Sequence, residues 1–424
     1  MRGVWDGHSL ISCLQLPLDY ATYTRMEILN YAANILHYAV SFFVIISIIV
    51  FVHEFGHFFV ARRCGVKIDE FSIGFGKEIF GWNDKKGTRW KIAVLPFGGF
   101  VKMHGDASEA SNPDVAALAD MSEAEKKISF HYKKLWQKAL VVLAGPGANF
   151  LFSIFIFAFV FMVYGKIQLD SPVVNTLVKG GAAEKIGMAP GDVVTELDGK
   201  AITKFTQIPE AIKASTKPVL DITYKRGDKV IHDKIAPEVV EDKDAAGKTV
   251  KIGRIGIGNM LIGVDKNASR LNPLEAISEA VSQVYGQAAG MLEGIWQMIV
   301  GTRSSKELAG PVGIVNYAGQ VTMKLTGAVA CEFSSTGTGC GEMAREGVLI
   351  SLLFMTLIST SLGLINLFPI PVLDGGHLLF YSYEAIMRRP LPEKAQSWAF
   401  KLGLAYVAFR LIYATYNDIG RMLG

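Results

Sequence analysis

The sequence predicts a polytopic α-helical membrane protein with about four transmembrane helices, a membrane-associated β-hairpin or sheet, and an inserted extracytoplasmic α/β domain. Two observations carry this prediction. The 424 residues are 50% hydrophobic and only 19% charged, with a mean hydropathy of +0.30, which is too apolar for an ordinary soluble protein and too polar for a bundle made only of spans. The apolar residues also gather in long runs, which a stretch of soluble character interrupts.

The predicted spans are residues 34–59, 135–164, 348–367 and 398–416. The last of them is amphipathic. Basic residues flank the runs and predict which ends face the cytoplasm; they are Arg62, Arg63, Lys67, Lys133, Lys134, Lys138, Arg388, Arg389, Lys394 and Lys401. The net charge of +4 forms no basic patch interleaved with aromatic residues, so we expect no nucleic-acid partner.

The sequence divides into five predicted parts. Residues 1–33 form an N-terminal extension without a signal-peptide pattern, in which Met26 is an alternative start. The remaining parts are a first membrane half (34–164), a soluble module (165–251), an extracytoplasmic linker (252–347) and a second membrane half (348–424).

An HExxH motif lies near the end of the first predicted span, at His53, Glu54 and His57. The two histidines are one helical turn apart, so both imidazoles can bind one zinc ion while Glu54 serves as a general base. Three specified positions match by chance on the order of once in a hundred chains of this length, and a surface helix carries such a match harmlessly. At membrane depth, ionisable groups need compensation, so we interpret the motif as a hydrated metal site.

Asp374 is the predicted third ligand. Pro369 and Pro371 break the helix after the third span. The first and third spans cross the membrane in the same direction, from outside to inside, so Asp374 can lie at the same depth as the two histidines. The alternative for Asp374 is a turn before Gly375. Two imidazoles and a carboxylate leave a fourth position for water, whose proton Glu54 can take and deliver to a leaving amine. We interpret His377 as a supporting or structural residue.

The glycine-punctuated segment from Phe71 to Met103 predicts a β-hairpin around a turn at Asn83–Gly87. It either dips into the bilayer or forms a cytoplasmic hairpin. In the second span, Asn149 follows small residues that permit close helix approach, and it is either an interhelical hydrogen-bonding residue or a substrate-binding residue.

The soluble module alternates strands with a helix at residues 208–214, which indicates a small α/β domain. After it, Asn272 and Pro273 predict a helix start, followed by an amphipathic pattern typical of a helix on the membrane surface. Cys331 and Cys340 flank a Ser/Thr/Gly loop and are a candidate disulfide if they face an oxidising compartment.

These motifs, in this order, resemble the site-2 protease family of intramembrane zinc metalloproteases, most closely its bacterial branch that regulates sigma-E. The resemblance covers nearly everything from Met26 onward and rests on HEFGH, FSIGFG, PFGGFVKM, AGPGANF and the segment from Asn366 to Gly375. The soluble module looks like a PDZ domain, for which peptide binding and a spacer role are both open. Many relatives have two such modules in tandem, whereas this sequence has one.

The resemblance implies one catalytic Zn²⁺, with His53, His57 and Asp374 as ligands and Glu54 as base. It implies substrate positioning by Asn366 and the Phe71–Met103 segment, and we add Asn149, Pro369 and Pro371 as candidate substrate-binding residues. The expected substrate is a single-span membrane protein such as an anti-sigma factor already cut by another protease, and also signal-peptide remnants. The expected location is the bacterial inner membrane, with the PDZ-like module and the cysteine loop periplasmic and the active site toward the cytoplasm.

Two other classes of protein compete with this interpretation. A PDZ-bearing membrane scaffold or chaperone would keep a structural metal, but such a site needs no Glu54 and closes all four positions. A transporter would show inverted repeats with interrupted helices in both halves, and the sequence has neither.

Overall fold

The computed structural model describes residues 16–106, 115–166, 172–174, 176–178, 180–215, 217–227, 229–243, 249–258, 269–301, 310–332 and 340–423. Its helices are α1 (Leu16–Arg63), α2 (Val115–Ala119), α3 (Glu123–Ile128), α4 (Leu135–Tyr164), α5 (Ala182–Lys185), α6 (Gln207–Ala214), α7 (Pro273–Val300), α8 (Pro311–Glu332), α9 (Cys340–Asn366), α10 (Asp374–Met387) and α11 (Glu393–Leu423). Its strands are β1 (Ile68–Asn83), β2 (Arg89–Met103), β3 (Thr176–Leu177), β4 (Val193–Leu197), β5 (Lys200–Ala201), β6 (Leu220–Arg226), β7 (Lys229–Ile235), β8 (Glu238–Lys243), β9 (Thr249–Arg254) and β10 (Ile257–Gly258).

The chain forms two compact units. The first consists of Met1–Gly145, Ala309–Phe354 and Phe368–Gly424, and the second of Pro146–Leu308 and Met355–Leu367. The first unit therefore contains α1, the β1–β2 sheet, α8, α10 and α11, and the second contains the soluble α/β module and α7. Each unit is described by itself below.

Three helices are long and apolar enough to cross a membrane: Ala32–Arg63, Leu135–Tyr164 and Ala344–Asn366. They confirm three of the four predicted spans. The fourth predicted span, residues 398–416, lies in α11, which is not among the three, because Lys401 and Arg410 interrupt its apolar surface. The helix that carries HExxH is also longer than predicted, since it begins at Leu16.

A glycine cap ends α1 at the predicted basic flank. Gly65 has a φ of +71°, and the N–H of Val66 donates to the carbonyl of Ala61 at 2.9 Å, a pattern typical of helix C-termini. The side chain of Arg62 then reaches forward to bind Asp84 and, at 2.9 Å, the hydroxyl of Thr88. The turn between β1 and β2 is thereby attached to the end of α1.

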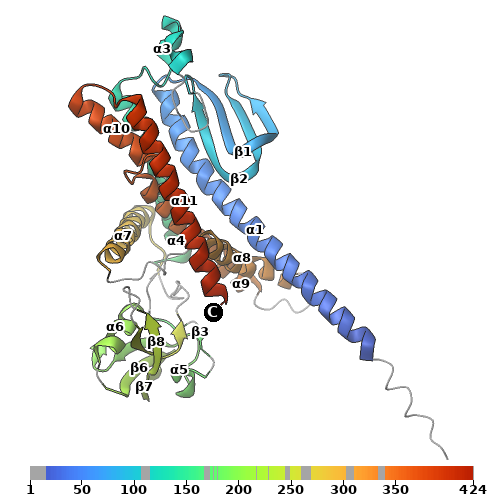
Figure 1. The fold of residues 1–424 in the computed structure, drawn as a ribbon. Coiled ribbons are helices and arrows are strands. Elements are labelled where there is room, and N and C mark those ends of the chain that lie inside the picture. Colours follow the sequence, from blue (N-terminus) through green and yellow to red (C-terminus); the bar gives the residue numbers. More distant parts are fainter. Residues whose placement is uncertain are drawn as a thin grey trace, which may run out of the picture. The chain divides into compact units, whose positions relative to one another are not determined.

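The β1–β2 sheet lies beside the C-terminal half of α1 (Figure 1). Both strands are long and bent, so parts of β1 have two partners: Phe71 pairs with Val101 on one side and with Trp90 on the other. Residues 99–103 therefore form one edge of the sheet and residues 78–83 the other. The predicted hairpin and its turn are confirmed, although the pairing is more extensive than a simple hairpin.

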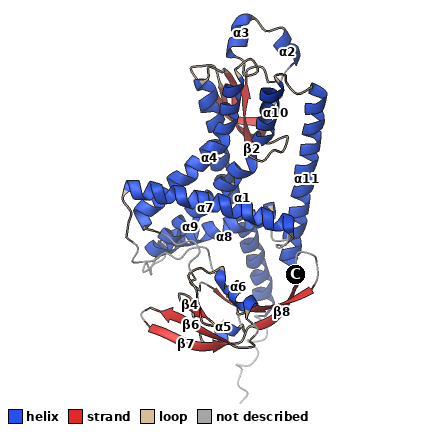
Figure 2. Cartoon of the chain, turned by 90° about the vertical axis from the view of Figure 1, so that its left-hand side faces the viewer, coloured by secondary structure: helices blue, strands red, loops and turns tan. Residues whose placement is uncertain are grey.

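The soluble module packs a four-stranded sheet, in the order β5-β4-β6-β7, against α6 (Figure 2). Its core is apolar and continuous; the fully buried members are Val174, Ala183, Val194, Leu197 and Ile235. β3 pairs with β10, so strand pairing extends the module to Gly258. The helix predicted at 208–214 is α6, which begins one residue earlier.

The helix predicted after Asn272 is α7. Asn272 caps it through a hydrogen bond from the N–H of Glu275 at 3.0 Å, and Pro273 is its first residue. In the first unit, the N-terminus of α8 is capped by the buried carboxylate of Asp418, which accepts N–H groups from Gly310 at 3.0 Å and Gly313 at 2.8 Å. The sequence did not predict α8 or α10 as helices. The side chains of Cys331 and Cys340 lie outside the described residues.

Candidate metal centre

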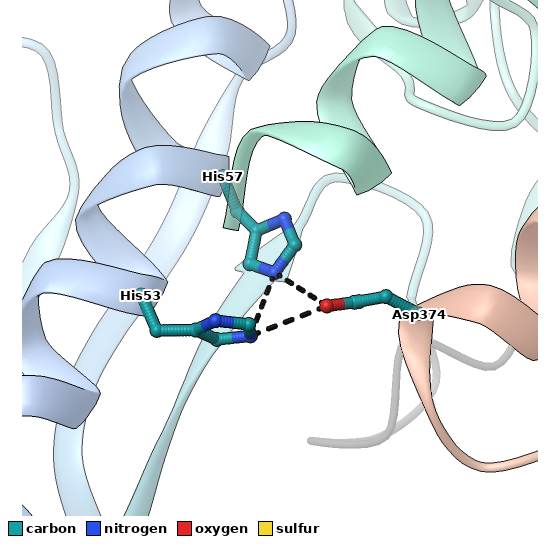
Figure 3. Close-up of side chains that lie close together, drawn as sticks. All are labelled: His53, His57 and Asp374. Carbon is teal, nitrogen blue, oxygen red and sulfur yellow. Dashed lines mark hydrogen bonds and ion pairs between the residues drawn. The ribbon is translucent and has the colours of Figure 1, made fainter. Parts of the chain in front are cut away.

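The side chains of His53, His57 and Asp374 converge from α1 and the start of α10 (Figure 3). His53 Nε2 lies 3.3 Å from His57 Nε2. Asp374 Oδ2 lies 3.2 Å from His53 Nε2 and 3.5 Å from His57 Nε2. Across the described residues, this is the one group of three or more His, Cys, Asp or Glu side chains whose atoms are placed to share a metal ion.

The three distances fit a tetrahedral zinc site. Zinc binds imidazole nitrogen and carboxylate oxygen at about 2.0 to 2.1 Å, so neighbouring ligand atoms in a tetrahedron are about 3.3 Å apart. The separations of 3.2, 3.3 and 3.5 Å match that edge length. Two nitrogens and one oxygen supply three ligands, which is the pattern of a catalytic zinc site with one position open.

The carboxylate of Asp374 supports this fit. Its Oδ2 atom is buried and makes no well-directed hydrogen bond, although both imidazoles lie within ion-pair distance. Burial alone would raise the pKa of Asp374, but the facing imidazoles of His57 and His53 hold that pKa below its usual range. A buried oxygen with this charge and no hydrogen bond is costly, and a bound cation would remove that cost.

A backbone carbonyl of α4 orients His57. The Nδ1 atom of His57 lies 2.8 Å from the carbonyl oxygen of Val141. Because a carbonyl only accepts, Nδ1 carries a proton, which leaves Nε2 as the ring nitrogen that can bind a metal. Metal-binding histidines are commonly held by such a hydrogen bond from the second ring nitrogen.

Gly145 allows α4 to approach both histidines. A Cβ atom at this position would lie 2.2 Å from His57 Nε2 and 2.9 Å from His53 Cε1. No side chain fits there without displacing a predicted ligand. The small residues around Gly145 predicted that another helix packs closely against α4. They did not predict that the groups packed there are the two histidines.

Glu54 lies beside the sheet, outside the ligand cluster. A Cβ atom at Gly99 would come within 3.0 Å of the Glu54 side chain and within 2.7 Å of the carbonyl oxygen of Ser72. Gly99 belongs to the edge segment of β2, residues 99–103. The side chain of Glu54 therefore lies next to this edge segment of the sheet.

Tight backbone contacts position the segment that precedes Asp374. A Cβ atom at Gly376 would lie 2.4 Å from the carbonyl oxygen of Ile370, and one at Gly403 would lie 1.8 Å from the carbonyl oxygen of Pro371. Val372 has a φ of +129°, a backbone conformation that β-branched residues rarely adopt. Sequence reasoning missed Gly403, because an isolated glycine in an amphipathic helix carries no signal of its contact.

The other candidate residues are distributed over both compact units. Pro369 is exposed and Pro371 half-buried, both in the turn before α10. Asn149 and Asn366 belong to the second unit. His377 is not one of the grouped ligands; its ring packs 5.6 Å from that of Phe400, and burial lowers its pKa.

Asn149 lies in a buried polar seam between α4 and α9 in the second unit. The hydroxyl of Ser359 donates to the carbonyl oxygen of Asn149 at 3.0 Å, and the hydroxyl of Thr360 donates to Ser153 at 3.0 Å. All four of these residues are 0% exposed. These hydrogen bonds link α4 to α9, but the first is accepted by the main chain of Asn149, so both roles considered for its side chain stay open.

Comparison with known proteins identifies the family. The model of peptidase family M50 matches residues 41–409. A protein of Rhizobium meliloti (strain 1021), provisionally named a zinc metalloprotease, is 38% identical over 91% of this chain and 96% of its own length. The metalloprotease MmpA of Caulobacter vibrioides is 34% identical over 90% of this chain and 95% of its own.

Among solved structures, the PDZ domain of an SdrC-like protein from Listeria monocytogenes is 23% identical, with a TM-score of 0.17, over 24% of this chain and 99% of that domain. A TM-score this low does not establish a shared fold. The family match spans most of the chain and includes the helix with both histidines and the segment with Asp374. The chain belongs to peptidase family M50, the site-2 protease family, and is a zinc metalloprotease of the membrane.

Proposed function

We propose that this metalloprotease hydrolyses peptide bonds in or near the transmembrane segment of single-span membrane proteins. The observation that carries the proposal is the triangle of ligand atoms at tetrahedral spacing, two of them on α1 within a stretch apolar enough to span a membrane. We assign His53, His57 and Asp374 as the ligands of one Zn²⁺ and Glu54 as the catalytic base.

The roles of the chain's own groups follow from their positions. A bound zinc ion supplies a Lewis acid and acidifies water. Glu54 accepts the proton of the attacking water and donates it to the leaving nitrogen, so that the products are a carboxylate and an amine. Val141 keeps His57 in the tautomer that presents Nε2, and Gly145 leaves space for both imidazoles.

The edge segment 99–103 is the proposed docking strand for substrate. A transmembrane helix hides its peptide bonds in its own hydrogen bonds, so cleavage requires local unwinding. An extended substrate gains new backbone hydrogen bonds by adding to an open sheet edge, and this edge passes Glu54 at Gly99. We further propose that Asn149, Asn366, Pro369 and Pro371 position substrate.

The proposed setting is the bacterial inner membrane, with the β1–β2 sheet dipping into the cytoplasmic side of the bilayer. The α/β module, which we propose to be PDZ-like, and the linker that contains α7 would be periplasmic. The proposed physiological substrate is an anti-sigma factor already trimmed by another protease, with signal-peptide remnants as a further class. The basic residues in the last turn of α1, Arg62 and Arg63, support this orientation.

The test is cleavage of a tagged single-span substrate by the purified protein. Glu54→Gln should abolish cleavage while retaining one zinc per chain, because Glu54 is not a ligand. Asp374→Asn should lose both cleavage and zinc. Chelation of the wild type should abolish cleavage, and added zinc should restore it. Cleavage that survives in Glu54→Gln would refute the assigned mechanism.

The docking strand has its own test. Single prolines at positions 100 to 102 remove one N–H each and leave Gly99, which contacts Glu54, unchanged; those N–H groups alternate between the paired and the unpaired side of the strand. A proline on the unpaired side should lower cleavage while thermal stability is kept, whereas a proline on the paired side should lower stability. Unchanged cleavage in all three variants would rule out strand addition at this edge.

A further inference from the structure

The β1–β2 sheet contains four carboxylates, and each has a basic partner. Asp69 lies 3.2 Å from Lys67, and Glu70 lies 2.6 Å from Lys91. Glu78 binds Arg89, and Asp84 binds Arg62. All acidic charge on the sheet is therefore neutralised within the first unit.

Two lysines in the turn between β1 and β2 remain without such a partner. Lys85 and Lys86 are exposed, and within the described part of the chain neither forms an ion pair. Their neighbour Asp84 cannot neutralise them, because its carboxylate accepts hydrogen bonds from Arg62, from the indole of Trp90 and from the N–H groups of Lys86 and Thr88. Burial opposes ionisation of Asp84, but these donors outweigh it and lower its pKa to about 2.

The position of this turn is fixed relative to the membrane-spanning part of α1. Arg62 lies in the last turn of the apolar stretch Ala32–Arg63, and it binds both Asp84 and Thr88. The hydroxyl of Thr88 in turn donates to the carbonyl oxygen of Ile68 at 2.6 Å. The turn therefore stands where the spanning helix leaves the bilayer.

The neighbouring edge segment shows the residue order of a membrane interface. Ile79, Phe80 and Trp82 are 67%, 61% and 47% exposed, and they precede the two lysines along the strand toward the turn. Apolar side chains, then tryptophan, then lysine is the order in which side chains occur from the hydrocarbon region to the headgroups. The charge and the apolar surface thus point to the same partner.

We propose that Lys85 and Lys86 bind the phosphate groups of anionic phospholipids and hold the edge segment 78–83 against the cytoplasmic leaflet. This inference rests on the proposed membrane position of the sheet but not on proteolysis. A lysine near an anionic surface gains about 1 kcal/mol, an enrichment of about fivefold. The occupant is a lipid surface rather than an acidic peptide, because the exposed side chains of Ile79, Phe80 and Trp82 adjoin the two lysines and need an apolar partner as well as an anionic one.

Lys77 provides a matched control on the same sheet. It is exposed and forms no ion pair in the described part of the chain, but it lies at the opposite end of segment 78–83 from the turn. Substituting Lys77 lowers the net charge of the sheet but leaves Lys85 and Lys86 in place. A second control, Lys213→Gln/Lys225→Gln, removes two exposed lysines from the soluble module.

The experiment measures quenching of Trp82 fluorescence in the full-length protein reconstituted into phosphatidylcholine vesicles. Acyl-brominated phosphatidylglycerol or acyl-brominated phosphatidylcholine is added at the same mole fraction. Subtracting the signal of Trp82→Phe isolates Trp82 from the other five tryptophans. We expect both lipids to quench Trp82, with phosphatidylglycerol severalfold more effective.

Lys85→Gln/Lys86→Gln should remove the preference for phosphatidylglycerol while quenching by phosphatidylcholine persists. Lys85→Arg/Lys86→Arg, Lys77→Gln and the soluble-module control should keep the preference. Equal quenching by both lipids in the wild type, or a preference that survives in Lys85→Gln/Lys86→Gln, would refute the headgroup site. No quenching by either lipid would refute the membrane position of the sheet as well. Cleavage is scored separately, so neither result is confused with failure of the protease proposal.

Discussion

Two places in the apolar helices bury polar side chains, and they differ in how those side chains are satisfied. In the seam between α4 and α9, each described hydroxyl donates to a neighbour: Ser359 to Asn149, Ser153 to Thr356 and Thr360 to Ser153. In the cluster of His53, His57 and Asp374, three ligand atoms face one another and the carboxylate oxygen makes no well-directed hydrogen bond.

The difference separates a packing role from a chemical one. A buried polar group without partners costs free energy, so a cluster that leaves an acceptor unsatisfied needs something from outside the protein. The hydroxyls of the seam donate to neighbouring groups and so help to hold α4 against α9. Burial of polar residues in a span therefore does not by itself indicate an active site; what distinguishes the cluster is that three metal-ligating side chains place their atoms within reach of one ion.

The largest effect that would break this comparison is expected at Gly145. Gly145→Val should displace both imidazoles, because even a Cβ atom would lie 2.2 Å from His57 Nε2. We expect loss of bound zinc and a fall in cleavage of at least about 100-fold, measured by metal analysis and peptide release.

The matched control for that prediction is Gly147→Val, in the same helix. A Cβ atom at Gly147 meets nothing within 4 Å, so zinc content and cleavage should stay near wild type. If both variants lose zinc equally, the effect belongs to the helix rather than to its contact with the histidines.

An intermediate effect is expected at a satisfied buried acid outside the spans. Asp192 is 1% exposed and accepts two hydrogen bonds from Arg226, at 2.8 and 2.7 Å, and one from the N–H of Ala189. Burial would raise the pKa of Asp192, but these donors lower it below its usual value. Asp192→Asn should destabilise the module by about 1 kcal/mol.

The sign of the pH dependence follows from the lowered pKa. The stability that Asp192 contributes is complete above the unfolded pKa of about 3.9 and is lost as pH falls through the lower folded value. Circular dichroism melts of wild type and Asp192→Asn should therefore converge on acidification. Melts that stay equally separated at every pH would show that the charge of Asp192 is not what stabilises the module.

The smallest effect is expected in the seam. Thr360→Val keeps the shape of the side chain and removes its hydrogen bond to Ser153. Interhelical hydrogen bonds in membranes are worth about 0.6 kcal/mol on average, so thermal stability should fall slightly while zinc content stays unchanged. A loss of zinc from this variant would mean that the seam and the metal cluster are one cooperative structure.

The sequence predicted the parts of this molecule whose signal is local. HExxH, the second span at Leu135–Tyr164 and the capped start of α7 follow from spacing, apolar runs and the Asn272-Pro273 pair. The prediction for Asp374 also depended on the first and third spans crossing the membrane in the same direction. The structure places Asp374 beside the two histidines, as expected. The assigned roles of these residues remain predictions for the experiments above.

Close contacts between residues far apart in the sequence could not be predicted from local patterns. Gly403 meets the carbonyl of Pro371, and Gly145 meets His57, because helices pass each other there; nothing in the flanking residues states which neighbour a glycine faces. The fourth predicted span is not confirmed, since α11 contains Lys401 and Arg410 and is not among the helices that are apolar enough to cross a membrane. Hydropathy alone does not decide how such a helix meets the membrane.

The partner of His57 Nδ1 is a main-chain oxygen, that of Val141, and this limits how the site can change during evolution or design. Where a carboxylate side chain holds a metal-binding histidine, a single substitution retunes the basicity of the ligand. No substitution at residue 141 removes a carbonyl. The electronic character of this ligand is therefore tied to the path of α4, and altering it requires moving a helix rather than exchanging a side chain.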